Sequence, residues 1–75
     1  MPHIIVKAFP GRTDEQKARL AEAVARSVID IFGSSDSSIS VAFEDVPQER
    51  WKEAVYDKDI AGGSVQLVKA PGYTM

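Results

Sequence analysis

Apolar and polar residues alternate in two short stretches, one near the start of the chain and one near its middle. The first opens at Pro2 and ends where Phe9, Pro10 and Gly11 break it, and its apolar set is Ile4, Val6 and Ala8. The second has the apolar set Ile39, Val41 and Phe43, which alternates with Ser40, Ala42 and Glu44. A period of two is typical of a strand with one face against a core, so both stretches are predicted strands.

The region between the two stretches has the pattern of an amphipathic helix. Thr13 and Gln16 stand at the spacing of a capping box, which places the helix start at Asp14, and Gly33 fits the left-handed cap at its end. The apolar positions recur every three or four residues: Leu20, Ala21, Val24, Ala25, Val28, Ile31 and Phe32. Strand, helix and strand within about 45 residues predict a right-handed crossover with parallel strands.

The last third of the chain carries weaker signals. Pro47 suits a first helical position, and Trp51 and Val55 are four residues apart, so a short helix is predicted over 47–56. A glycine pair then interrupts the chain, and residues 65–69 are predicted to form a short third strand. The expected fold is therefore α/β (α+β), with one β-α-β unit in a single domain over residues 1–75.

Length and composition indicate that one copy is not stable alone. A chain of 75 residues buries only about 60% of its unfolded surface. It has no cysteine for disulfides and a single histidine, so we expect no metal, no cofactor and a homo-oligomer. The net charge of −2, with scattered basic residues, argues against nucleic acid as a partner. No apolar run approaches about 18 residues and no signal-peptide pattern opens the chain, so we expect a cytoplasmic protein without membrane contact.

The proline at the second position is the first candidate for chemistry. If Met1 is removed, Pro2 begins the chain with a secondary amine, and α-amino groups titrate at roughly 7.7 to 8.0. Such an amine can accept and return protons near neutral pH. If Met1 stays, the same nitrogen is an inert tertiary amide. The alternative interpretation is that Pro2 merely opens a strand, where a missing N–H costs nothing.

Together with Pro2, the run from Gly11 to Lys17 (GRTDEQK) resembles the 4-oxalocrotonate tautomerase family. The resemblance continues through residues 37–41 and Trp51 to the closing run KAPGY at 69–73, and so covers nearly the whole chain. That last run is most similar to the dimeric branch that acts on phenylenolpyruvate-type enols. The resemblance therefore implies the tautomerase fold, completed by association of copies, and favours a dimer over a hexamer.

The resemblance also implies a mechanism, the keto–enol tautomerisation of 2-oxo acid enols with Pro2 as general base and acid. Arg12 matches the position that binds a substrate carboxylate, a task that suits a guanidinium, and Trp51 matches an aromatic wall beside the proline. Without the motif, Arg12 would be a solvated residue before a helix and Trp51 a core residue. Ser40 replaces a second arginine of the family, which favours a small-molecule monocarboxylate with an apolar tail, such as phenylenolpyruvate.

Two other functions remain open at this point. The same superfamily includes 3-haloacrylate dehalogenases, in which a glutamate activates water, and Glu53 stands where that glutamate would fall. Phe9, however, occupies the position of an arginine that those enzymes need. The second alternative is a non-catalytic oligomeric binding module, which would follow from a retained Met1.

Four further residues of the sequence could contribute to the site. Strand alternation points His3 away from the face of Ile4, so we expect a structural or interface role for it rather than a catalytic one. Lys7, Lys69 and Tyr73 could reach the active site of a neighbouring copy in a dimer, but the sequence does not place them.

Overall fold

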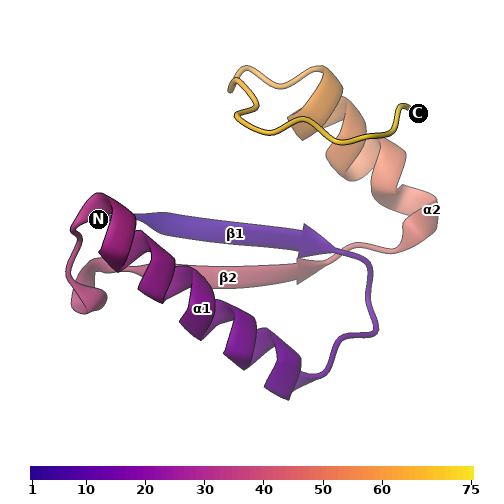
Figure 1. Ribbon diagram of the computed structural model, residues 1–75. Coiled ribbons are helices and arrows are strands. Elements are labelled where there is room, and N and C mark those ends of the chain that lie inside the picture. Colours follow the sequence, from indigo (N-terminus) through magenta and orange to yellow (C-terminus); the bar gives the residue numbers. More distant parts are fainter. The chain divides into compact units, whose positions relative to one another are not determined.

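The computed structural model describes all residues from Met1 to Met75, which form two compact units, residues 1–45 and 46–75. In the first unit, strand β1 (His3–Ala8) is followed by helix α1 (Asp14–Phe32), and a short 3₁₀ turn η1 (Asp36–Ser38) leads into strand β2 (Ser40–Asp45). This β-α-β order confirms the predicted fold class (Figure 1).

The two strands form a parallel pair, as the crossover predicted. Their register runs from His3 opposite Ser40 to Ala8 opposite Asp45. Helix α1 covers one face of this sheet (Figure 1). The alternation of the sequence follows from this one-sided cover: Ile4, Val6, Val41 and Phe43 are half-buried, whereas His3, Ile5, Ser40 and Ala42 are exposed.

The ends of α1 are determined by local hydrogen bonds. Thr13 Oγ1 accepts the Gln16 backbone N–H at 3.1 Å, and Gln16 Oε1 accepts the Thr13 backbone N–H at 2.8 Å, which completes the capping box. At the other end Gly33 has φ 74°, and its N–H donates to the Ile29 carbonyl at 3.0 Å. Both predicted boundaries of this helix are confirmed.

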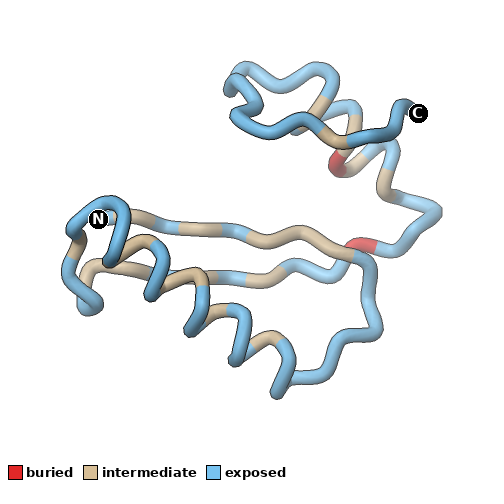
Figure 2. The backbone as a smooth tube through the Cα atoms, viewed as in Figure 1, coloured by how far each residue is buried: buried red, intermediate tan, exposed pale blue.

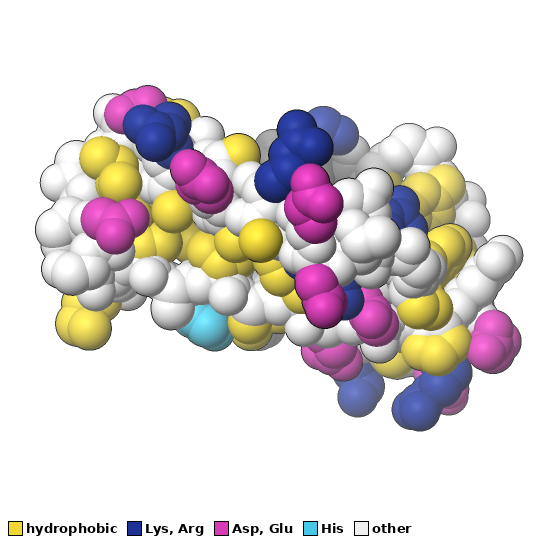
Figure 3. Space-filling view, turned by 90° about the horizontal axis from the view of Figure 1, so that it is seen from below, with side chains coloured by type: hydrophobic (Ala, Val, Ile, Leu, Met, Phe, Trp, Pro, Cys, Tyr) yellow, Lys and Arg dark blue, Asp and Glu magenta, His cyan; other side chains and the backbone are white.

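The apolar stripe of α1 is only partly covered by the sheet. Ala21, Val24, Ala25 and Val28 are half-buried, but Ile31 and Phe32 are 78% and 74% exposed. The exposed part forms an open apolar groove along the helix, lined by Leu20, Ala23, Val24, Val28, Ile31 and Phe32. In Figure 3, apolar side chains reach the surface between charged ones. The stripe is thus wider than one two-stranded sheet can cover.

The single chain has almost no interior. Val46 and Val55, at 4% and 5% exposure, are the only buried residues (Figure 2). Burial of apolar surface is the main favourable contribution to folding. A chain with so few buried residues therefore needs additional protein surface to pack against its exposed apolar side chains.

In the second unit, helix α2 (Gln48–Trp51) continues directly into a π-helix, η2 (Lys52–Ala61). The predicted short helix is present, although it runs five residues beyond 56, and Pro47 is its N-cap rather than its first helical residue. Gly62 ends it, with its N–H donating to the Asp57 carbonyl at 3.0 Å. A Cβ on Gly62 would lie 2.5 Å from that carbonyl oxygen, so only glycine permits this close approach.

The third strand predicted over 65–69 is not formed. The only sheet contains β1 and β2, and residues 65–69 carry no regular structure. Val65 and Val68 are largely or fully exposed. The prediction was wrong for the isolated chain because a strand requires the hydrogen bonds of a neighbouring strand, and this segment has none. Neither helix of the chain is both long and apolar enough to pass through a membrane.

Candidate active site

Pro2 immediately precedes β1, which begins at His3. Its carbonyl accepts the backbone N–H of Ser40 at 3.2 Å, so the backbone of Pro2 is tied to the start of β2. The hydrogen bonds between β1 and β2 do not involve the nitrogen of Pro2. The lack of an N–H on this residue therefore does not lower the stability of the sheet. Pro2 is half-buried and Met1 is fully exposed. Removal of Met1 would leave an amine on an anchored residue.

Ser40 and His3 lie beside Pro2, on the sheet face that α1 leaves uncovered. Ser40 Oγ and His3 Nδ1 share a hydrogen bond of 2.6 Å, and the register places the two residues directly opposite each other. His3 therefore lies on the face opposite Ile4, as alternation predicted. The contact with Ser40 was missed from the sequence, although the parallel register of the two predicted strands could have revealed it.

Arg12 lies beyond the other end of β1, in the loop before α1. Gly11 has φ 117°, which favours glycine at this turn, and Arg12 Nη1–H donates to the Phe9 carbonyl at 3.4 Å. The arginine borders a hollow of about 200 Å³ whose apolar walls include Val6, Leu20 and Phe43. A guanidinium beside apolar walls is suited to an acid with an apolar tail.

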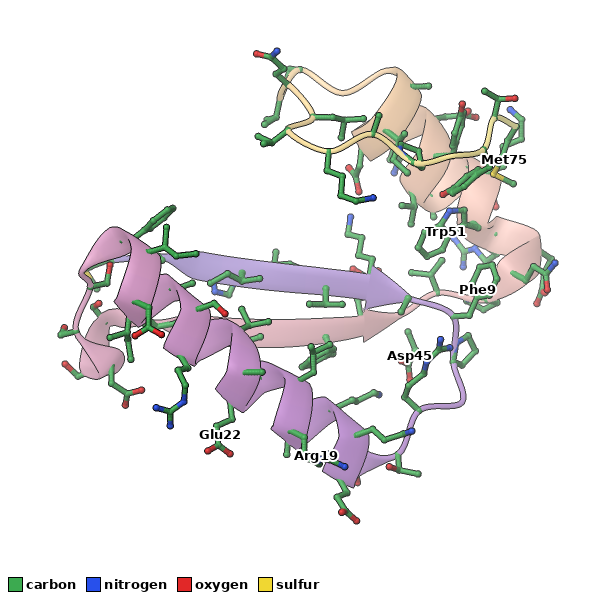
Figure 4. All side chains as sticks on the ribbon, in the orientation of Figure 1. Phe9, Arg19, Glu22, Asp45, Trp51 and Met75 are labelled. Atoms are coloured by element: carbon green, nitrogen blue, oxygen red, sulfur yellow. The ribbon has the colours of Figure 1, made fainter.

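Of the two cations at this hollow, only Arg12 lacks an acidic partner. Lys17 Nζ lies 3.1 Å from both carboxylate oxygens of Asp45, the last residue of β2. Figure 4 shows Asp45 and Phe9 near the same end of the sheet. The charge of Lys17 is thus offset within the chain, whereas that of Arg12 is available to a bound anion.

Pro2 and Arg12 are held at opposite ends of the same strand. β1 has six residues, and at about 3.3 Å per residue it spans roughly 20 Å. That separation exceeds the reach of an arginine side chain and the size of a small carboxylate. Within one chain the structure therefore brings Pro2 together with Ser40 and His3, but not with Arg12.

Trp51 belongs to the second unit, at the end of α2. Its indole Nε1–H donates to the hydroxyl oxygen of Tyr73 at 3.0 Å, and the ring of Tyr73 lies 5.8 Å from that of Tyr56. The C-terminal segment that ends at Met75 runs alongside this helix (Figure 4). Tyr73 was considered from the sequence, but its bond to Trp51 was not foreseen.

The remaining candidates are Glu53, Lys69 and Lys7. Glu53 is 71% exposed along its side chain, and one of its carboxylate oxygens lies 3.6 Å from Arg50 Nε. Lys69 is exposed in the irregular C-terminal segment, and Lys7 is half-buried on β1. No group of three or more His, Asp or Glu side chains is placed to hold a metal ion.

The sequence matches a known protein family and several known proteins. The family described as "Tautomerase enzyme" matches residues 2–58. Tautomerase PptA of Enterobacter sp. (strain 638) is 47% identical over 76 residues, covering 100% of both chains. A protein of Xylella fastidiosa named "Probable tautomerase" is 45% identical over 73 residues, covering 97% of this chain and 89% of its own.

Two solved structures show the same fold. One is a 4-oxalocrotonate tautomerase isozyme from Methylibium petroleiphilum, with a TM-score of 0.64 and 32% identity, covering 67% of this chain and 81% of its own. The other is YwhB, a homologue of 4-oxalocrotonate tautomerase, with a TM-score of 0.65 and 38% identity, covering 76% of this chain and 90% of its own.

Proposed function

The chain belongs to the tautomerase family, and from this premise we propose that it interconverts the enol and keto forms of 2-oxo acids. Pro2 is the acid–base group in this proposal, once Met1 has been removed. The observation that carries it is the position of Pro2, whose carbonyl is bonded to Ser40 while its nitrogen lies outside the ladder. An amine on an anchored backbone can take the hydroxyl proton of an enol and return a proton to carbon.

The active site in this proposal is shared between two copies of the chain. Pro2 and Arg12 lie at opposite ends of β1, too far apart to contact the same small molecule. A second copy that brings its Arg12 to the proline of the first would supply the missing cation. Its guanidinium would bind the substrate carboxylate through paired hydrogen bonds and hold the enol against the amine.

Association of copies is supported independently by the lack of an interior. The groove along α1 exposes Ile31 and Phe32, and the uncovered sheet face exposes Ile5. A second copy would bury this apolar surface at about 25 cal/mol per Å². We therefore propose a homo-oligomer in which the α1 groove is covered by another copy, with a dimer as the simplest closed form.

The substrate proposed is a monocarboxylate with an apolar tail, such as phenylenolpyruvate. Where the family resemblance expects a second arginine, this chain has Ser40, whose hydroxyl is engaged with His3. One cation suits one carboxylate, and the aromatic ring of Trp51 can pack against a phenyl tail. A strong preference in kcat/KM for the dianion 2-hydroxymuconate over phenylenolpyruvate would contradict this choice of substrate.

The direct experiment follows phenylenolpyruvate decay by its ultraviolet absorbance, with three preparations whose N-termini are verified by intact mass. The first begins at Pro2, the second is Pro2→Ala, and the third retains Met1. We expect activity in the first alone, with losses of at least about 10²-fold in the others. Equal rates in all three would exclude proline-based chemistry. If the protein purified from cells carried Met1, a non-catalytic binding role would be favoured instead.

A further inference from the structure

The C-terminal segment places a tyrosine hydroxyl directly at the tryptophan of the candidate site. Tyr73 accepts the indole N–H of Trp51 at 3.0 Å, although 22 residues separate them in sequence. Indole nitrogen is a donor only, so the tyrosine oxygen must be the acceptor in this bond. The bond with Trp51 therefore does not use the phenolic proton of Tyr73, and no other group of the chain accepts that proton.

The helix geometry brings a third aromatic residue to the same place. Trp51 and Tyr56 are five residues apart, and in the π-helical segment that begins at Lys52 hydrogen bonds join residues five apart. The Tyr56 ring lies 5.8 Å from the Tyr73 ring at an interplanar angle of 37°. Trp51 and Tyr56 are both half-buried, so the Tyr73 ring is held by a hydrogen bond on one side and by ring packing on the other.

The return of the chain to Trp51 depends on two glycines at the helix end. A Cβ on Gly63 would lie 2.8 Å from the Asp59 carbonyl oxygen, and the corresponding distance for Gly62 and Asp57 is 2.5 Å. These close approaches let the chain leave the helix and turn back. The segment then reaches the half-buried Pro71 before Tyr73.

We propose that Tyr73 is a substrate-binding residue, which donates its phenolic hydrogen bond to a carboxylate oxygen of the 2-oxo acid enol bound beside Trp51. This inference rests on the proposed function, because Trp51 is the expected wall of that site. Tyr73 remains 44% exposed, so its hydroxyl is accessible to a small molecule.

The test compares Tyr73→Phe with the matched variant Tyr56→Phe, which removes a hydroxyl from the other ring of the pair. Phenylenolpyruvate turnover gives kcat and KM. Binding of the non-reacting aryl acid trans-cinnamate gives a dissociation constant from quenching of Trp51, the only tryptophan of the chain. We expect Tyr73→Phe to lower kcat/KM and cinnamate affinity by about ten- to a hundredfold, as for a lost bond to a charged group. Tyr56→Phe should stay within about twofold.

The two measurements separate failure of this inference from failure of the proposed function. A wild-type protein that binds cinnamate but has no turnover would refute the tautomerase function, while loss of binding in Tyr73→Phe would still support the inference. Tyr73→Phe within about twofold of wild type in both measurements would overturn it. Equal losses in both variants would overturn it as well, because they would show that the effect is not specific to the Tyr73 hydroxyl.

A double-mutant cycle adds a readout that does not depend on fluorescence. Trp51→Phe keeps an aromatic ring but removes the N–H that holds the Tyr73 oxygen. If the bond from Trp51 positions the Tyr73 hydroxyl, the two substitutions remove the same interaction. The kcat/KM of the double variant should then lie within about twofold of that of the less active single variant. Additive losses would mean that the hydroxyl does not depend on Trp51, which would overturn the positioning.

Discussion

A site shared between copies can be tested by mixing two variants that have each lost one of its residues. Pro2→Ala removes the proposed base, and Arg12→Ala removes the cation that has no partner at the hollow. Each variant alone should have little activity. Because β1 holds the two residues roughly 20 Å apart, an intact pair must come from two chains. A mixed oligomer can unite Pro2 of an Arg12→Ala chain with Arg12 of a Pro2→Ala chain.

The expected magnitude follows from the number of intact pairs. After random mixing in equal amounts, about half of the chains carry Pro2 and about half of their neighbours carry Arg12, so about a quarter of the sites are complete. This fraction is the same for a dimer and a larger ring, provided that each site draws on two chains. We therefore expect kcat per chain to recover to about a quarter of the wild-type value, with the wild-type KM.

The assay follows phenylenolpyruvate after the two variants have been unfolded and refolded together, with native mass spectrometry to confirm mixed oligomers. The matched control mixes wild type with the Pro2→Ala/Arg12→Ala double variant. Shared sites again give about a quarter of full activity in this control, whereas sites within one chain give about a half. No recovery from the single variants, together with half activity in the control, would refute the shared site.

Two further predictions concern folding and association. Thr13→Ala removes the 3.1 Å bond to the Gln16 N–H and should lower the free energy of unfolding by about 1 kcal/mol, measured by urea denaturation at fixed protein concentration. Thr13→Ser should retain most of this stability, and equal losses in both would argue against the cap. Ile31→Lys should weaken self-association in analytical ultracentrifugation, because it places a charge in the exposed α1 groove. Ala18→Lys adds the same charge to an exposed position of α1 outside the groove, so equal weakening by both would contradict that interface.

The regular elements were readable from the sequence because they depend on local pattern. Alternation gave both strands to within a residue or two, and the capping box and Gly33 gave both ends of α1. The parallel pairing followed from the short crossover. The sequence also placed Pro2 at the start of β1 and Arg12 in the loop after it, because both residues adjoin a predicted strand.

The contacts that the candidate residues make within each unit depend on residues far apart in sequence. His3 meets Ser40, and Trp51 meets Tyr73, through the register of a strand pair and the reversal of the C-terminal segment. No period or spacing in the sequence reveals the contact of Trp51 with Tyr73, and that of His3 with Ser40 follows only once the register of the two strands is known. The absence of a strand over 65–69 has the same origin, because alternation describes one strand and not the neighbour to which it must bond.

The sequence by itself determined the β-α-β order of the first unit and where α1 starts and ends, and it supplied the candidate residues for chemistry. Only the tertiary structure decided that His3 meets Ser40, that Tyr73 meets Trp51 and that part of the apolar stripe of α1 stays exposed. Local elements arise from interactions within a few residues, whereas distances and exposed surfaces arise from how those elements pack. In this chain β1 separates Pro2 from Arg12 and the packing leaves the α1 groove uncovered, which is why the proposed chemistry requires a second copy.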